Sequence, residues 1–173
     1  MFKSKFIDLL AAFSHDEIKE FDRFLNSPFF NRDKMILQSF RFIKKFYPEF
    51  NNPKFTKENF FKFLYPGKQY NDSRVRNILS DLLKHGQDYI TIKFTRSNPF
   101  VENTSALEAL SVRMLDTLFI KKISEAYDSI DIKKHDPDEI FLYRKKLEDL
   151  KYDFFFQFLY RKKLEDLKYD FFF

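Results

Sequence analysis

The amino-acid sequence predicts an all-α protein in which an orthogonal helical array is followed by a long helical hairpin, with six or seven helices in total. The 173 residues include only two glycines and six prolines. Sheets and tight hairpins usually need more glycine, because their turns require positive φ. Apolar residues also recur at helical spacing, as in Phe6, Leu10 and Phe13. Ser14 and Glu17 then form the pattern of a capping box, which marks the start of the next helix.

The first part of the chain is divided into helices by capping residues and prolines. These boundaries are expected at Ser27-Pro28, Asn31, Pro48, Thr56, Pro66-Gly67 and Asn71 or Asp72. The last helix of this part either breaks at Gly86 or continues past it, and the run from Ser97 to Pro99 favours a turn. We therefore predict a compact helical domain over residues 1–96.

The second part, residues 97–173, is expected to form the long helical hairpin. Its first helix would run from Thr104 or Ser105 to about Asp128. The apolar side chains that this helix offers for burial are Leu107, Leu110, Met114, Leu118, Ile120 and Ile123. After a polar loop, Asp136 is a favourable N-cap and Pro137 a favourable first residue for the final helix.

The final helix runs into a duplicated segment. Residues 141–156 read FLYRKKLEDLKYDFFF, and after Gln157 the same sixteen residues occupy 158–173 without a change. Repeat architectures use periods of roughly 20–50 residues, and their units diverge. We therefore interpret this short, identical repeat as a recent in-frame duplication, a truncated reading frame or an assembly error.

The two copies cannot bury the same face of one straight helix. The apolar stripe consists of Tyr143, Leu147, Leu150 and Phe154 in the first copy and of Tyr160, Leu164, Leu167 and Phe171 in the second. The offset of 17 residues rotates the second stripe by about 100°, so the first stripe would continue into charged residues such as Arg161. We predict that residues 141–156 pack natively and that 158–173 are poorly packed, splayed or swapped.

The composition excludes several classes of protein. The chain has 26 phenylalanines, 33% charged residues, no cysteine and a net charge of +5. Without cysteine there is no disulfide, no thiolate catalysis and no cysteine-ligated zinc. The sequence has no apolar run of about 18 residues that could span a membrane and no signal-peptide pattern at its start. A cytoplasmic protein is the expectation.

No catalytic, cofactor-binding or metal site is predicted. Two isolated glycines cannot form a phosphate-binding loop, and His15, His85 and His135 lack the context of a catalytic motif. The acidic residues around His135 lack the glycine and the spacing of a calcium loop, and helix capping explains them better. We expect no enzymatic activity, no cofactor and no small-molecule substrate.

Three segments of the first hundred residues are similar to segments found in other proteins. These are FSHDEIKEFDRFLNSPFFN (residues 13–31), FYPEF (46–50) and FLYPGKQYND with the following RN and SDLLK (63–84). They resemble the N-terminal region of an uncharacterised family of longer helical bacterial proteins. The resemblance implies an α-helical fold and a chain that is an N-terminal fragment, and it implies no activity.

Residues 56–96 suggest an alternative interpretation of the protein's function. A short helix, a turn, a longer helix and the segment YITIKF (89–94) match the order of a winged helix-turn-helix with its first wing strand. The cations that could meet DNA phosphates are Arg74, Arg76, Lys84, Lys93 and Arg96. Continuous helix through residues 89–94 would count against the wing.

The leading interpretation is a non-enzymatic helical module for protein–protein interaction, as part of a larger scaffold protein. A protein partner or self-association is expected. The alternative is a DNA-binding protein that uses the segment 56–96.

Overall fold

The computed structural model describes residues 2–131 and 135–170, with side chains to residue 164. This part of the chain contains eight α-helices and no strand, which confirms the all-α class. The helices are α1 (Lys5–Ala11), α2 (His15–Asn26), α3 (Lys34–Lys44), α4 (Lys57–Leu64), α5 (Asp72–Ser97), α6 (Pro99–Val112), α7 (Asp116–Asp128) and α8 (Pro137–Asp170). The predicted count of six or seven is too low because one predicted helix is divided in two.

Several side chains that were predicted to cap helices do so, but α3 is capped by Asp33 and not by Asn31 as predicted. The Ser14 hydroxyl accepts a hydrogen bond from the backbone N–H of Glu17 at 3.2 Å, and the Glu17 carboxylate accepts one from the backbone N–H of Ser14 at 2.8 Å. Thr56 caps α4. At the start of α8, the Asp136 carboxylate accepts a hydrogen bond from the backbone N–H of Asp138 at 2.9 Å. These bonds satisfy N–H groups that have no partner within their own helix.

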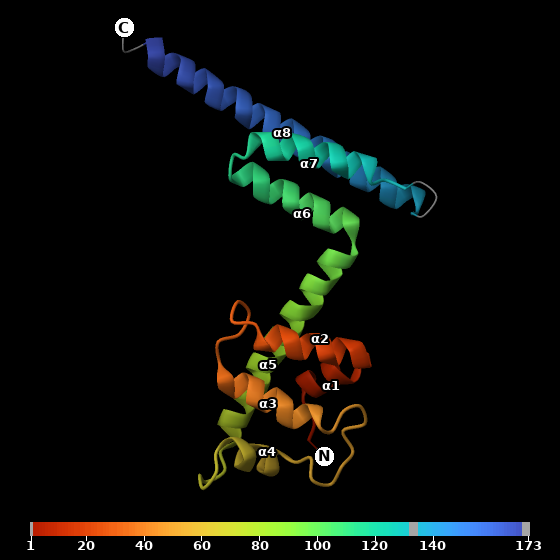
Figure 1. Cartoon of the computed structure of the whole chain (residues 1–173), viewed down its shortest axis with the longest axis vertical. Coiled ribbons are helices and arrows are strands. Elements are labelled where there is room, and N and C mark those ends of the chain that lie inside the picture. Colours follow the sequence, from red (N-terminus) through yellow and green to blue (C-terminus); the bar gives the residue numbers. More distant parts are fainter. Residues whose placement is uncertain (1, 132–134, 171–173) are drawn as a thin grey trace. The chain divides into compact units, whose positions relative to one another are not determined.

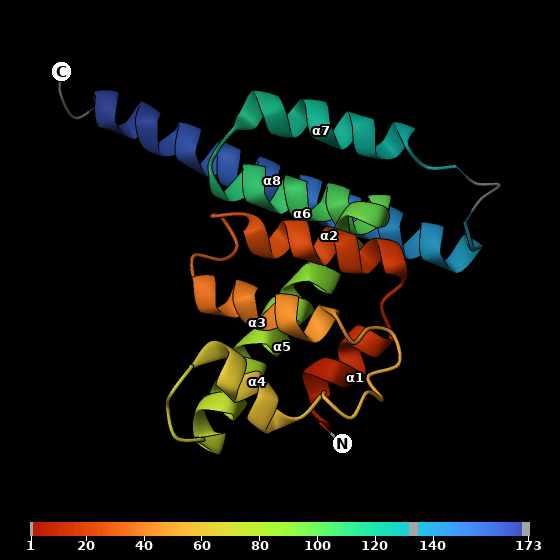
Figure 2. The same ribbon diagram turned by 60° about the horizontal axis from the view of Figure 1, so that its bottom comes forward.

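The chain divides into two compact units, residues 1–93 and 94–173. In the first unit, α2 and α3 lie across α5 at a steep angle, as the prediction of an orthogonal array requires (Figures 1 and 2). Phe21 is fully buried at its centre. Its ring centroid lies 5.0 Å from that of Phe40, 5.4 Å from Tyr89, 5.8 Å from Phe13 and 6.2 Å from Phe6. The phenylalanines of this unit therefore serve mainly as its core.

Helix α5 is continuous, so the predicted wing strand at residues 89–94 is wrong. Gly86 lies inside the helix and is buried. A Cβ atom on Gly86 would lie 2.6 Å from Cδ2 of Leu9, so glycine permits α1 to approach α5 closely. The buried face of α5 carries Val75, Leu82 and Tyr89. Burial of this face outweighs the weak helix propensity of one glycine, which costs about 1 kcal/mol relative to alanine.

Besides the end of α5, the described part of the second unit has three helices, which corrects the predicted two-helix hairpin. The helix expected from Thr104 to Asp128 begins earlier, with Asn98 as its N-cap, and it breaks after Val112. Met114 there adopts a left-handed conformation with φ 57°. The Leu115 backbone N–H donates to the Leu110 carbonyl at 3.1 Å, a bond that closes the end of α6.

This break changes which apolar residues of the second unit are buried. Leu107 and Ile123 are buried as predicted, but Phe119 is fully buried as well. The residues Met114, Leu118 and Ile120, which were predicted to be available for burial, are 60%, 51% and 52% exposed. The turn resets the helical phase, so that α7 presents Phe119, Ile123 and Ala126 to the core.

Helix α8 runs through the first copy of the duplicated segment and into the second as far as Asp170. It is straight in Figure 1 and extends past the α6–α7 turn. Its first half packs beside α6 and α7. At 34 residues it is about 51 Å long, more than twice the length of either neighbour. None of the helices in the described part of the chain has the length and apolarity needed to cross a membrane.

Candidate interaction surface

The inner stripe of α8, formed by Tyr143, Leu147, Leu150 and Phe154, anchors the helix in the second unit. Leu147 and Phe154 are fully buried, and Tyr143 is 5% exposed. The Tyr143 ring stacks on Phe100 with centroids 4.0 Å apart, and the Phe154 ring stacks on Phe119 at 3.9 Å. The amide of Asn103 donates a hydrogen bond to the Tyr143 hydroxyl at 3.1 Å. These contacts confirm that the first copy packs in the core.

The second copy has the same residues in a different environment. Tyr160 is 59% exposed and Leu164 is 44% exposed, so the prediction of poor packing is confirmed for both; Leu167 and Phe171 lie outside the described side chains. The inner direction of α8 is taken instead by Arg161, whose guanidinium forms an ion pair with Asp116 at 2.9 Å. Because the second copy begins 17 residues later on a straight helix, equivalent side chains of the two identical copies point in different directions.

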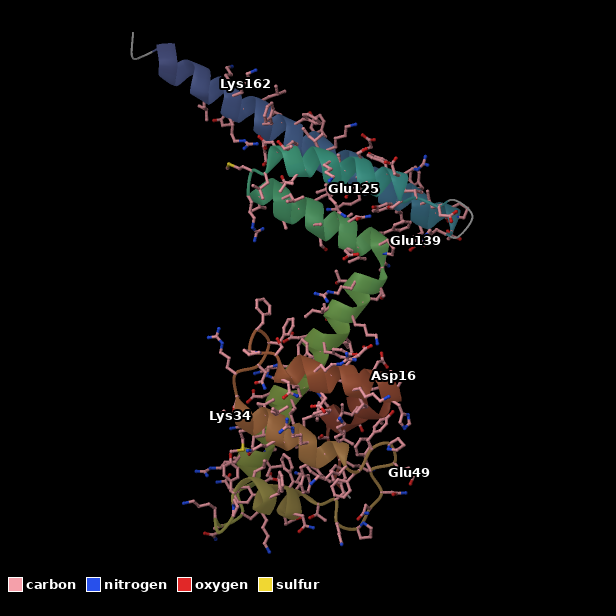
Figure 3. All side chains as sticks on the ribbon, in the orientation of Figure 1. Asp16, Lys34, Glu49, Glu125, Glu139 and Lys162 are labelled. Atoms are coloured by element: carbon pink, nitrogen blue, oxygen red, sulfur yellow. The ribbon has the colours of Figure 1, made fainter. Side chains whose placement is uncertain are left out.

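The outer face of α8 lies opposite the inner stripe. Phe156 follows Leu147 by nine residues, which places it about 180° around the helix axis. We define the outer face by its large apolar side chains, which are Phe141, Leu142, Tyr152, Phe156, Leu159 and Tyr160. Each of them is between 59% and 73% exposed. Figure 3 shows the part of α8 around Lys162 with no neighbouring helix of this unit beside it.

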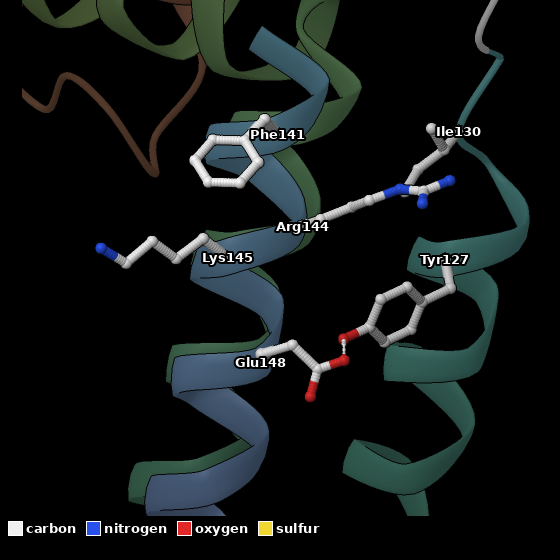
Figure 4. Close-up of a pocket in the computed structure, with 6 residues that line it drawn as sticks. All are labelled: Tyr127, Ile130, Phe141, Arg144, Lys145 and Glu148. Atoms are coloured by element: carbon white, nitrogen blue, oxygen red, sulfur yellow. Dashed lines mark hydrogen bonds between the residues drawn. The ribbon is translucent and has the colours of Figure 1, made fainter. Parts of the chain in front are cut away.

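A pocket of about 630 Å³ lies between α7 and α8 at one end of the outer face (Figure 4). Its lining residues are Tyr127, Ile130, Phe141, Arg144, Lys145 and Glu148. The Tyr127 hydroxyl donates a hydrogen bond to the Glu148 carboxylate. Burial, together with this bond, raises the pKa of Tyr127 to about 12. The lining of the pocket combines the apolar side chains of Ile130 and Phe141 with the charged side chains of Arg144, Lys145 and Glu148.

The five cations of the DNA-binding alternative do not form one surface. The helical period places Arg74 and Arg76 about 160° apart around α5. Arg76 forms an ion pair with Asp72, and Lys84 forms one with Asp81. The remaining three lie elsewhere: Arg74 is 5.5 Å from the Tyr65 ring, Lys93 faces α2, and Arg96 belongs to the second unit. Binding to DNA stays a prediction that this arrangement does not favour.

Arg76 instead lines a pocket of about 490 Å³ in the first unit, together with Lys3, Lys5 and Lys57. Asp72 pairs with both Arg76 and Lys57 at 3.1 and 3.0 Å. One carboxylate balances only one of these two cations, so the pocket has an excess of positive charge to which Lys3 and Lys5 add. The pocket could not be predicted from the sequence, because its residues come from three separate segments.

Lys93 is part of an ion network between α5 and α2. Its ammonium group lies 2.8 Å from the Glu20 carboxylate and 3.3 Å from that of Glu17. The Glu20 carboxylate also accepts a hydrogen bond from the Tyr89 hydroxyl at 2.7 Å. The hydrogen bond from Lys93 is the main cause that lowers the pKa of Glu20. For Glu17, the hydrogen bond from the Ser14 backbone is the main cause of a lowered pKa.

Replacing Lys93 with methionine should make the first unit less stable at pH 7 and less sensitive to acid. A carboxylate with a depressed pKa stabilises the folded state above its unfolded pKa of about 4.3, and that contribution is lost as the pH falls through the folded pKa. The difference in denaturation midpoint between the native chain and Lys93→Met should therefore shrink between about pH 5 and pH 3. Lys84→Met, which removes only the exposed pair with Asp81, is the control. An equal effect of both variants at pH 7 would contradict the role of the network.

Comparison with known protein families, with curated proteins and with solved structures finds no match to this chain. Among the side chains that the structure describes, in residues 2–131 and 135–164, no group of three or more His, Cys, Asp or Glu is arranged to hold a metal ion.

Proposed function

We propose that the chain is a non-enzymatic helical module for protein–protein interaction and that the outer face of α8 is its contact surface. The observation that carries this proposal is the balance of apolar residues in the second unit. Nine hydrophobic side chains form its core, whereas fifteen large hydrophobic side chains of this unit are exposed among the described residues. The first unit shows the opposite balance, with 23 buried and four exposed.

Exposed apolar side chains in this concentration favour association. Single exposed hydrophobic residues are ordinary, but contiguous patches on soluble proteins mark interaction sites. The aromatic side chains of Tyr152 and Tyr160 lie about 40° to either side of Phe156 around the helix axis, so all three share one face of α8. Aromatic side chains of this kind supply a large share of the binding energy at protein interfaces.

The proposal is tested by photo-crosslinking from the outer face. The photoreactive amino acid p-benzoylphenylalanine replaces Phe156 in the full chain, in cells that naturally make the protein. The matched control places it at Phe29, an aromatic residue of the first unit that is 87% exposed. We expect a discrete covalent protein adduct from position 156 and little from position 29. No adduct from position 156, or equal yields from both, would overturn the proposal.

A further inference from the structure

The outer face of α8 is symmetric in sequence about Phe156. Tyr152 and Tyr160 lie four residues to either side of it, and Asp149 and Lys163 lie seven residues to either side. Four residues correspond to a rotation of about 40° and seven residues to about 20° in the opposite sense. All five side chains therefore project in nearly the same direction, along about 21 Å of helix.

The two charged members of this set have opposite signs and no ion-pair partner among the described residues. Asp149 and Lys163 are both exposed. A two-fold axis that passes through Phe156, perpendicular to the helix, exchanges their positions. Each carboxylate would then meet an ammonium group across the axis.

We infer that the partner of the outer face is a second copy of this chain, which packs antiparallel against α8 about a two-fold axis at Phe156. The inference rests on the proposed function and names its partner. Phe156 meets the partner's Phe156 at the centre, Tyr152 meets the partner's Tyr160, and Asp149 pairs with the partner's Lys163. The interface is isologous, so each of the last two contacts occurs twice.

Charge selects the antiparallel orientation over the parallel one. In a parallel pair with the same register, Asp149 would lie beside the partner's Asp149 and Lys163 beside the partner's Lys163. Like charges at facing positions of paired helices repel, whereas the antiparallel pair converts both repulsions into attractions. The apolar centre stays the same in both arrangements.

The surface exists only because the segment is duplicated. Asp149, Tyr152 and Phe156 belong to the first copy, and Tyr160 and Lys163 belong to the second. The symmetric set spans the junction at Gln157. A chain with only the first copy would present three of these five side chains.

The oligomeric state of the purified full chain, measured by sedimentation equilibrium, tests the inference. We expect a dimer, and we expect Phe156→Asp to raise the dissociation constant by about 100-fold or more, because two charges would meet at a desolvated centre. Phe29→Asp is the control for loss of an exposed aromatic side chain and should leave the dimer unchanged. A native chain that stays monomeric at about 100 μM, or a dimer unaffected by Phe156→Asp, would overturn the inference.

Charge reversal tests the pairing itself. Asp149→Lys and Lys163→Asp should each raise the dissociation constant by about tenfold, because each places like charges together at two symmetric positions. The double variant restores opposite charges and should return the constant to within about threefold of the native value. Additive weakening in the double variant would exclude the proposed pairs.

The absence of cysteine from the chain allows a test of orientation. Two Phe156→Cys chains should form a disulfide on oxidation, because side chains on the two-fold axis are adjacent. Phe141 lies fifteen residues from the axis, which puts two Phe141→Cys sites about 45 Å apart in the antiparallel pair. Equal crosslinking at both positions would indicate parallel pairing and contradict the inference. A monomeric chain whose position 156 crosslinks to a different protein in cells would overturn the inference and leave the proposed function standing.

Discussion

Alanine at Phe21 is expected to destabilise the first unit by about 3–5 kcal/mol, which is the usual cost of removing a fully buried aromatic side chain. Phe21 is 0% exposed, and the rings of Phe6, Phe13, Phe40 and Tyr89 surround it. The cavity left by alanine would remove contacts to helices α1, α3 and α5 together. A loss of this size is comparable with the whole stability of many small domains.

Hydrogen exchange of the full chain, followed by mass spectrometry, measures this effect on the first unit separately. Amides of α2 and α5 should lose most of their protection in Phe21→Ala. Phe29→Ala is the matched control, because Phe29 is 87% exposed, and we expect a change within about 0.5 kcal/mol. Similar losses in both variants would show that Phe21 does not organise the core.

The second large effect is expected at Leu147, for which the chain provides its own control. Leu147 and Leu164 have the same neighbours for six residues before them and nine after, so local helix propensity is nearly the same at both sites. Leu147 is 0% exposed and Leu164 is 44% exposed. Leu147→Ala should cost about 2–5 kcal/mol, whereas Leu164→Ala should cost less than about 1 kcal/mol.

Protection of the α6 and α7 amides against hydrogen exchange distinguishes these outcomes. Because nine hydrophobic side chains form the core of the second unit, loss of one leucine should open all three helices. Equal effects of Leu147→Ala and Leu164→Ala would mean that either copy can supply the side chains that pack against α6 and α7. A larger loss of stability in Leu147→Ala than in Leu164→Ala would support the conclusion that the first copy is buried and the second copy is exposed.

The helical class and most helix starts could be predicted from the sequence because they depend on local chemistry. Ser14, Thr56 and Asp136 cap helices through bonds to residues two or three positions away. The exposure of Tyr160 and Leu164 followed from the helical period alone. The caps depend on contacts within the first turn of a helix, and the exposure depends only on the regular period of one helix.

The features that could not be predicted depend on contacts between distant segments. Met114 takes a left-handed conformation without being glycine or asparagine, and the break it makes allows both Leu107 and Phe119 to reach the inner stripe of α8. Gly86 is compatible with a break or with a helix interior, and the close approach of Leu9 decides for the interior. The apolar residues of the outer face are interleaved in the sequence with those of the inner stripe of α8. The two faces could therefore not be distinguished from the sequence.

The unequal packing of the two copies has a consequence for proteolysis. Both contain the tripeptide Arg-Lys-Lys, at residues 144–146 and 161–163, so trypsin meets chemically identical cleavage sites. The site at 144–146 lies in the part of α8 that carries the buried inner stripe, whereas the site at 161–163 follows Phe154, the last buried side chain of α8 among the described residues. Local opening of a helix is easier where fewer buried contacts hold it. The order in which trypsin cuts the two sites therefore compares the local stability of α8 at these two points.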